Sequence, residues 1–368
     1  MSSFVSSRAL AVLLLAGSTL GAAEPAAFRW HLDVGPTYWT RTRLTYGANA
    51  SVDPSTAAKT DRTYDDGFNK VDASGNLGDG TATGLASRTG NFGFISDSQV
   101  DLKAGTLALH RTSALDGIYR DAGNTAERPS WQVNLRLSLA DVKLNRRDWG
   151  AEAGLDWARF KDASTGPAAA SLRVLTDTYA LGGVVPQRAP YTGRFSPLPG
   201  DQRIGDTPTR SNATVAGSLN GSRSFSAKTT IFRVGGWWEV KRSAIVEPEP
   251  EEDKWSIFLR GGLAFSSTKA NFSVDEQPQA NGVAAGQRVV AAGSGSRSGT
   301  GFYLGVNARR ILTPRVALIG GVDYLRGPKV TVSQGDRFAS LDLSRSFLFR
   351  LALEVGLDRL EETKNAKP

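Results

Sequence analysis

Apolar and polar residues alternate one by one along most of this chain, and the pattern is clearest near its C-terminal end. From Ser346 to Leu357 the sequence is SFLFRLALEVGL, in which every second residue from Phe347 onwards is Phe, Leu or Val. Successive side chains of a β-strand point to opposite faces. The segment therefore predicts a strand with one wholly apolar face and one mixed, charged face.

Similar alternation elsewhere predicts about twelve strands, with ten to fourteen possible. The twelve segments are 28–39, 91–95, 100–109, 131–139, 149–157, 172–176, 213–219, 225–238, 255–265, 302–306, 316–322 and 346–357. Asn220-Gly221 is a strong hairpin-turn signal between two of them. An even number of antiparallel strands with one apolar face predicts an all-β fold, a closed antiparallel up-and-down transmembrane β-barrel.

The connections divide into short and long ones. Tight turns are expected at 145–148 and 311–314, and long polar loops at 41–88 and 269–298. In membrane barrels short turns lie on the periplasmic side and long loops lie outside. With twelve strands, the Pro-rich stretch 185–208 falls on the periplasmic side. It cannot be a central strand, because Pro donates no ladder hydrogen bond. Long connections are unusual on the periplasmic side, so either the stretch folds into the lumen or the count has missed a strand.

The distribution of charge between the two faces favours a membrane barrel over a secreted soluble β-protein. A small soluble barrel is filled by its apolar face, whereas here the apolar face is large, nearly uncharged and ends in aromatic residues such as Trp149 and Trp157. The lumen would then receive the charged face. The candidate lumen-facing residues are Arg29, His31, Asp33, Arg136, Glu152, Asp156, Arg260, Arg309, Asp323, Arg350 and Glu354.

Composition narrows the chemistry further. The chain has 368 residues, no Cys and a formal net charge of +8, so no disulfide framework is possible. The cations are spread singly, which does not favour a nucleic-acid partner. Two His residues without ligand spacing predict neither a metal site nor a cofactor. The acidic stretch 247–253 predicts a solvated turn rather than a calcium loop.

The first residues have the features of an export signal. Arg8 precedes the apolar run ALAVLLLA at 9–16, and small residues at 21–23 follow it. This order predicts a secretory signal peptide at 1–23, too short to span a bilayer as a helix. The expected organisation is a barrel at 24–357 and a periplasmic tail at 358–368, with the cleaved protein in the outer membrane.

On these features the chain resembles Gram-negative outer-membrane β-barrel proteins over nearly its whole mature length. DDGFNKVDASGN and LGGVVPQRAPYTG also look like segments of an uncharacterised, porin-like group of such barrels. The resemblance implies membrane lipid, lipopolysaccharide and the outer-membrane assembly machinery as partners. It departs from the class at the end, because DRLEETKNAKP follows the last strand where the class usually ends on an aromatic residue.

Three functions are compatible with such a barrel. The interior charges could line a passive pore for small hydrophilic solutes or ions. They could instead join in ion pairs that plug the lumen of a structural or surface-interaction protein. An outer-membrane hydrolase is the third alternative, with His31 as its base. We expect no enzyme, because no nucleophile elbow accompanies the histidine.

Overall fold

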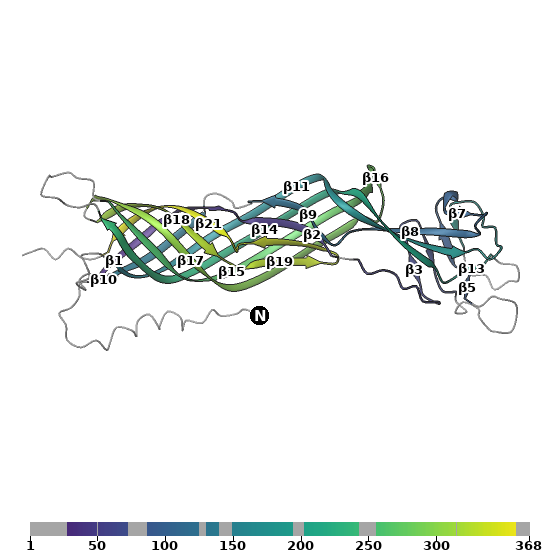
Figure 1. Cartoon of the computed structure of the whole chain (residues 1–368), viewed down its shortest axis with the longest axis horizontal. Coiled ribbons are helices and arrows are strands. Elements are labelled where there is room, and N and C mark those ends of the chain that lie inside the picture. The colour runs from purple at the N-terminus through teal and green to yellow at the C-terminus, as the bar shows by residue number, and fades with distance from the viewer. Residues whose placement is uncertain are drawn as a thin grey trace, which may run out of the picture.

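The computed structural model describes residues 28–49, 51–72, 87–124, 130–139, 149–193, 202–242, 255–313 and 315–357 (Figure 1). The expected signal peptide, the turn at 145–148, the acidic stretch 247–253 and the tail at 358–368 lie outside these residues. Within the described ranges, no helix has the length and apolar character needed to cross a membrane.

Eight antiparallel strands pair side by side in a closed ring. In ring order they are β1 (Phe28–Thr40), β10 (Ser130–Leu139), β11 (Trp149–Ala180), β14 (Thr209–Arg242), β15 (Trp255–Ala280), β17 (Val289–Thr313), β18 (Val316–Arg326) and β21 (Ser346–Gly356). The last strand, β21, pairs with β1, and β10 pairs with β11, so every neighbour in the ring is hydrogen-bonded. The all-β, closed antiparallel fold expected from the alternation is confirmed.

The described ring has fewer strands than the twelve expected, for two reasons. Segment 91–95 lies outside the ring in a separate small sheet, and segment 100–109 lies outside the ring beside the far part of β11. Two pairs of expected strands are each one continuous strand. Segments 149–157 and 172–176 both belong to β11, and segments 213–219 and 225–238 both belong to β14.

The expected hairpin turn at Asn220-Gly221 is wrong, because these residues lie in the middle of β14. Asn220 is opposite Pro167 on one neighbour and Gln277 on the other, so both edges of the strand are paired there. Gly221 has φ 155°, and a Cβ atom on it would lie 1.9 Å from the carbonyl oxygen of Asp275. The glycine is therefore required by close strand contact rather than by a turn.

Four of the ring strands, β11, β14, β15 and β17, continue far beyond the other four. Their extensions form one wall of a second level of the molecule, which we call the second storey. Their extensions face a four-stranded sheet made of β19 (Lys329–Gln334), β20 (Arg337–Asp342), β2 (Arg43–Ala48) and β9 (Gly117–Gly123). The long loop expected at 269–298 is mostly strand, with β15 and β17 leaving only 281–288 between them, where β16 (Val283–Ala284) lies. The long polar segment 41–88 likewise contributes β2 to this storey.

A small distal region follows the second storey (Figure 1). It contains β8 (Thr106–Ala114) with β7 (Val100–Asp101), the 3-10 helix η1 (Asp97–Gln99), and short pieces of sheet. These pieces are β3 (Arg62–Thr63), β4 (Gly67–Asn69), β5 (Arg88–Thr89), β6 (Phe92–Phe94), β12 (Tyr191–Thr192) and β13 (Ile204–Gly205). The described parts of the Pro-rich stretch lie here through β12 and β13. The stretch is thus at the end that carries the long connections, not at the end of the short turn between β17 and β18, as expected from twelve strands.

The interior of the molecule changes character along the strands. The ring of eight strands encloses charged and polar side chains, whereas the second storey encloses a continuous apolar core. This upper core draws residues from both walls. Its large members include Trp39, Leu44, Tyr46, Phe160, Phe225, Phe272, Val332 and Leu341.

Candidate functional site

The candidate site is the charged interior of the ring, where most of the sequence-derived candidates meet. Eight of them are at most 4% exposed and lie inside the ring. They are Asp33, Arg136, Glu152, Asp156, Arg260, Asp323, Arg350 and Glu354. The side chains of His31 and Arg309 keep 15% and 23% exposure near the open end. The side chain of Arg29 lies outside the described residues.

Arg136, from β10, is the centre of one half of the network. Its guanidinium donates to Asp33 at 3.2 Å and also pairs with Glu354. The same group lies 4.6 Å from the ring centre of Phe258 and 5.4 Å from that of Trp237, so it is held by charge and by aromatic faces together. Arg350 completes this half, donating to Asp33 at 3.1 Å.

The second half of the network joins three carboxylates through two arginines. Arg260 lies 3.2 Å from Glu152 and 3.5 Å from Asp323. Arg233 bridges Asp323 at 3.1 Å and Asp156 at 2.8 Å. Each arginine therefore connects carboxylates from two different strands, and together they tie four strands across the lumen.

Three further residues belong to the network but were not among the sequence candidates: Arg233, Tyr303 and Asn134. Arg233 is flanked by Phe232 and Val234, and its own face of β14 continues as Gly235 and Trp237, which hides its inward position.

Tyr303 and Asn134 are uncharged residues that connect the charged groups. The Tyr303 hydroxyl donates to Glu152 at 2.6 Å. The Asn134 amide donates to both Glu152, at 3.2 Å, and Asp33, at 3.3 Å, and so links the two halves. Tyr303 lies between the outward residues Phe302 and Leu304, so the alternation along β17 could have predicted its inward position. The alternation could not have predicted that its partner is Glu152.

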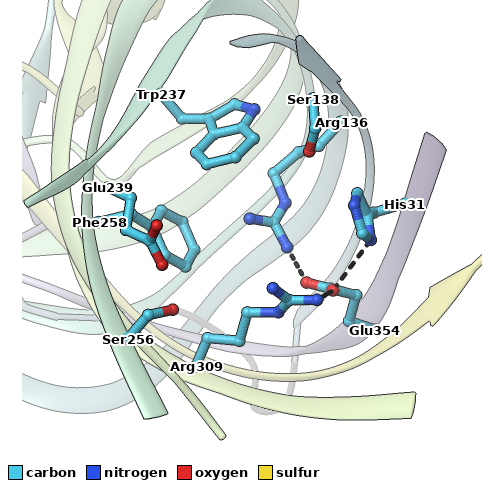
Figure 2. Close-up of a pocket in the computed structure, with 9 residues that line it drawn as sticks. All are labelled: His31, Arg136, Ser138, Trp237, Glu239, Ser256, Phe258, Arg309 and Glu354. Carbon is cyan, nitrogen blue, oxygen red and sulfur yellow. Dashed lines mark hydrogen bonds and ion pairs between the residues drawn. The ribbon is translucent and has the colours of Figure 1, made fainter. Parts of the chain in front are cut away.

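A small pocket opens at the end of the network that lies away from the second storey. Figure 2 shows its lining, in which Glu354 receives Arg136, Arg309 and His31. Arg309 lies 2.6 Å from Glu354 and His31 Nδ1 lies 3.1 Å from it. The free volume is about 10 Å³, room for one water-sized sphere.

The chemistry of this interior is mutual neutralisation. Buried charges are tolerated when paired and hydrogen-bonded, and here each carboxylate of the network meets at least one guanidinium. Within the described ranges, no group of three or more His, Asp or Glu side chains is arranged to hold a metal ion. The arrangement can stabilise a closed lumen, and the pocket around Glu354 lies at its more exposed end.

The upper core lies directly beyond this network. Trp39 and Phe160 are fully buried there and meet edge to face, with ring centres 5.6 Å apart at 85°. Above the core a second buried ion cluster closes the storey. Glu276 accepts from Arg337 at 3.1 Å and from the Tyr119 hydroxyl at 2.9 Å, and it forms an ion pair with Arg223 at 2.5 Å.

The second histidine lies in the distal region. His110 Nδ1 is 2.6 Å from Asp66, and the neighbouring Asp65 accepts from the backbone of Thr112. The hydrogen bond to Asp66 raises the pKa of His110, against the opposing effect of burial. Burial raises the pKa of Asp65, with hydrogen bonding opposing it. The His110–Asp66 pair fastens β8 to the turn that follows Tyr64.

The raised pKa of His110 predicts a pH-dependent stability. The pair's contribution should be fully present below the unfolded histidine pKa of about 6.5 and lost as pH rises through the higher folded pKa. We expect the urea midpoint to fall between pH 6 and pH 9 by more in the native chain than in His110→Gln. Equal falls in the two proteins would show that the pair contributes nothing.

Comparison with known proteins gives structural likeness only. No family model and no curated protein matches the chain. Among solved structures, the outer membrane protein OprG from Pseudomonas aeruginosa is 9% identical, with a TM-score of 0.31 over 91% of this chain and 98% of that one. The outer membrane protease OmpT from Escherichia coli is 8% identical, with a TM-score of 0.28 over 92% and 99%.

A third solved structure is Ail, the attachment invasion locus protein of Yersinia pestis. It is 12% identical, with a TM-score of 0.26 over 68% of this chain and 94% of that one. These structures are outer-membrane β-barrel proteins, the class that the sequence resembles. At such TM-scores the likeness carries no argument about activity, substrate or partner.

Proposed function

We propose that this chain is an outer-membrane β-barrel whose lumen is closed to solutes and whose long strands carry a surface region away from the membrane. The observation that carries the proposal is the succession of two seals. The ion-pair network fills the ring, and the fully buried aromatic residues of the upper core, such as Trp39 and Phe160, block the way directly beyond it. A solute would have to separate buried ion pairs and then cross a packed apolar core.

The outer face of the ring supports the membrane location. Each of the eight ring strands carries one outward aromatic residue at the boundary towards the second storey. This upper girdle consists of Tyr38, Trp131, Trp157, Phe232, Phe265, Phe302, Tyr324 and Phe347. Near the other end four strands carry Trp30, Trp149, Trp238 and Trp255. Aromatic girdles at both interfaces are typical of membrane barrels.

The spacing of the girdles matches a bilayer. Trp149 and Trp157 lie on the same face of β11, about 26 Å apart along the strand at 3.3 Å per residue. With the usual tilt of membrane strands this corresponds to about 20 Å of height, close to the apolar band of such barrels. Between the girdles the outward side chains are exposed and apolar, including Leu263, Leu304, Leu351 and Leu353.

The extended strands support a surface role. From Trp157 to Ala180, β11 continues for about 75 Å along its own length, and its last nine residues pair with β8 of the distal region. The second storey and the distal region would thus stand outside the lipid. Long loops of membrane barrels lie on the outer surface. His31 pairs with Glu354 and His110 pairs with Asp66, and the proposal assigns catalysis to neither histidine.

The proposal is tested by single-channel recording of the refolded chain in a planar bilayer, with insertion checked by flotation of the same preparation with vesicles. We expect flotation and a silent bilayer. Discrete, reproducible conductance steps would overturn the closed lumen in favour of a pore. Failure of the folded protein to float with vesicles would overturn the membrane location.

Substitution on the outer face gives an independent prediction. Leu351 is half exposed at mid-height of β21, so Leu351→Arg should lower the free energy of unfolding from a membrane by about 2–4 kcal/mol. The matched control is Ser294→Arg, on the exposed face of β17 beyond the girdle, which should change it by less than about 0.5 kcal/mol. Equal effects of the two substitutions, measured by urea titration in vesicles, would contradict a lipid-facing ring.

A further inference from the structure

Positively charged side chains follow the upper girdle on, or immediately beside, six of the eight ring strands. Each lies within four residues of its strand's aromatic residue, on the side of the second storey, and each is exposed. We call this set the cationic collar; its members are Arg41, Arg159, Lys228, Lys269, Arg326 and Arg345. Within the described part of the chain, none of the six forms an ion pair with a carboxylate.

Three collar residues stand in one row across neighbouring strands. Arg159 on β11 is directly opposite Lys228 on β14, and Lys228 is directly opposite Lys269 on β15. Neighbouring strands are about 4.8 Å apart, so three positive charges fall within about 10 Å. Like charges directly opposite each other destabilise a sheet. Such a row is stable where an anion lies against it.

Hydroxyl groups lie between this row and the girdle. Thr230, Ser267 and Ser298 are opposite one another in the register of β14, β15 and β17, and all three are exposed. They lie one pleat closer to the girdle than Lys228 and Lys269. Hydroxyl donors beside guanidinium and ammonium groups are the set that phosphate oxygens accept from.

We propose that the cationic collar binds the phosphate groups of a multiply phosphorylated membrane lipid, such as the lipid A part of lipopolysaccharide. The inference rests on the proposed membrane location, and it adds the residues that would bind the phosphates of such a lipid. The position of the collar, just beyond the lipid-facing apolar band, identifies a membrane lipid as the partner. The acyl chains would lie against the apolar band, and the phosphates would then meet the hydroxyl and cation rows just beyond the aromatic girdle.

The experiment measures binding of fluorescent bisphosphorylated lipid A to the refolded full chain in zwitterionic detergent. The test variant is the collar triple Arg159→Gln, Lys228→Gln and Lys269→Gln. A cation near an anionic lipid surface contributes about a fivefold gain in affinity, so the triple variant should bind roughly 100-fold more weakly. These substitutions remove only exposed side chains and relieve repulsion, so the triple variant should fold.

Two control variants separate charge at the collar from charge in general. Arg159→Lys, Lys228→Arg and Lys269→Arg keep the charges in place and should keep the affinity within about threefold. Lys103→Gln, Arg188→Gln and Arg315→Gln remove three exposed charges elsewhere and should also leave it unchanged. Equal lipid A affinities for the native chain and the collar triple would overturn the proposal.

The lipid source and the membrane location are tested with the same proteins. Monophosphorylated lipid A should bind the native chain more weakly, and inorganic phosphate at millimolar concentration should not displace the bisphosphorylated lipid. Displacement by inorganic phosphate would show a free-phosphate site and overturn the lipid assignment. If native chain and collar triple both float with vesicles but bind lipid A equally, the collar proposal alone fails. If neither floats, the proposed function itself fails.

Discussion

Arg136→Met should lower the free energy of unfolding by about 3–5 kcal/mol, because it removes one member of a buried ion cluster and leaves charge without compensation. Arg136 is 2% exposed, and its guanidinium serves Asp33 and Glu354 together. After the substitution Asp33 keeps Arg350, whereas Glu354 keeps only the more exposed Arg309 and His31. The measurement is urea unfolding of the refolded chain in vesicles.

A double-mutant cycle identifies the cause of the loss. In a Glu354→Gln background the same Arg136→Met substitution should cost at least about 1 kcal/mol less, because the uncompensated carboxylate is already gone. Lys103→Met, at an exposed distal position, is the matched control and should change stability by less than about 0.5 kcal/mol. Additive effects of the two network substitutions would contradict a coupled ion cluster.

Phe160→Ala should cost about 3–5 kcal/mol of unfolding free energy, since it removes a fully buried ring from the upper core. The ring of Phe160 packs edge to face on Trp39, so the cavity would open between β11 and β1. The bilayer should nevertheless stay silent, because the ion-pair network still fills the ring beneath. The measurements are urea unfolding and planar-bilayer recording on the same preparation.

A milder substitution at the same position serves as the control. Phe160→Leu refills most of the removed volume and should cost clearly less than Phe160→Ala. A loss below about 1 kcal/mol for Phe160→Ala would show that the second storey is not a packed core. Conductance steps in Phe160→Ala alone would show that the upper core is the principal seal and that the network beneath it passes ions.

The alternation of side chains predicted the fold class, because a strand's period of two is a local property that the sequence displays directly. The strand count required information that is not local. Asn220-Gly221 carries a hairpin signal, but the paired edges of β11 and β15 hold this segment extended. Beyond the girdle the outward face becomes polar, as in Lys269, Asn271 and Ser273, so the extended part of β15 has the composition of a loop.

The candidate site was predictable as a face but not as a network. The alternation along each strand identified the charged residues that point inwards. Which of them form ion pairs depends on which strands become neighbours in the ring. Arg136 and Glu354 are 218 residues apart in the chain. Arg233 escaped because apolar residues precede and follow it. The collar was not predicted because its members lie on or beside six different strands, and only the register of the ring shows that three of them form a row.

The two changes of polarity described above occur at the same level of the barrel, and together they fix how deep the protein sits in its membrane. Outside, apolar Trp157 is followed by Arg159; inside, Asp156 is followed by Ala158 and Phe160. A displacement of one pleat inward would carry Arg159 to the level of the aromatic girdle, and the reverse displacement would bring the aromatic girdle into water. The vertical position is therefore set to within about 5 Å. A band this narrow also selects thin bilayers, such as the bacterial outer membrane, over thicker ones.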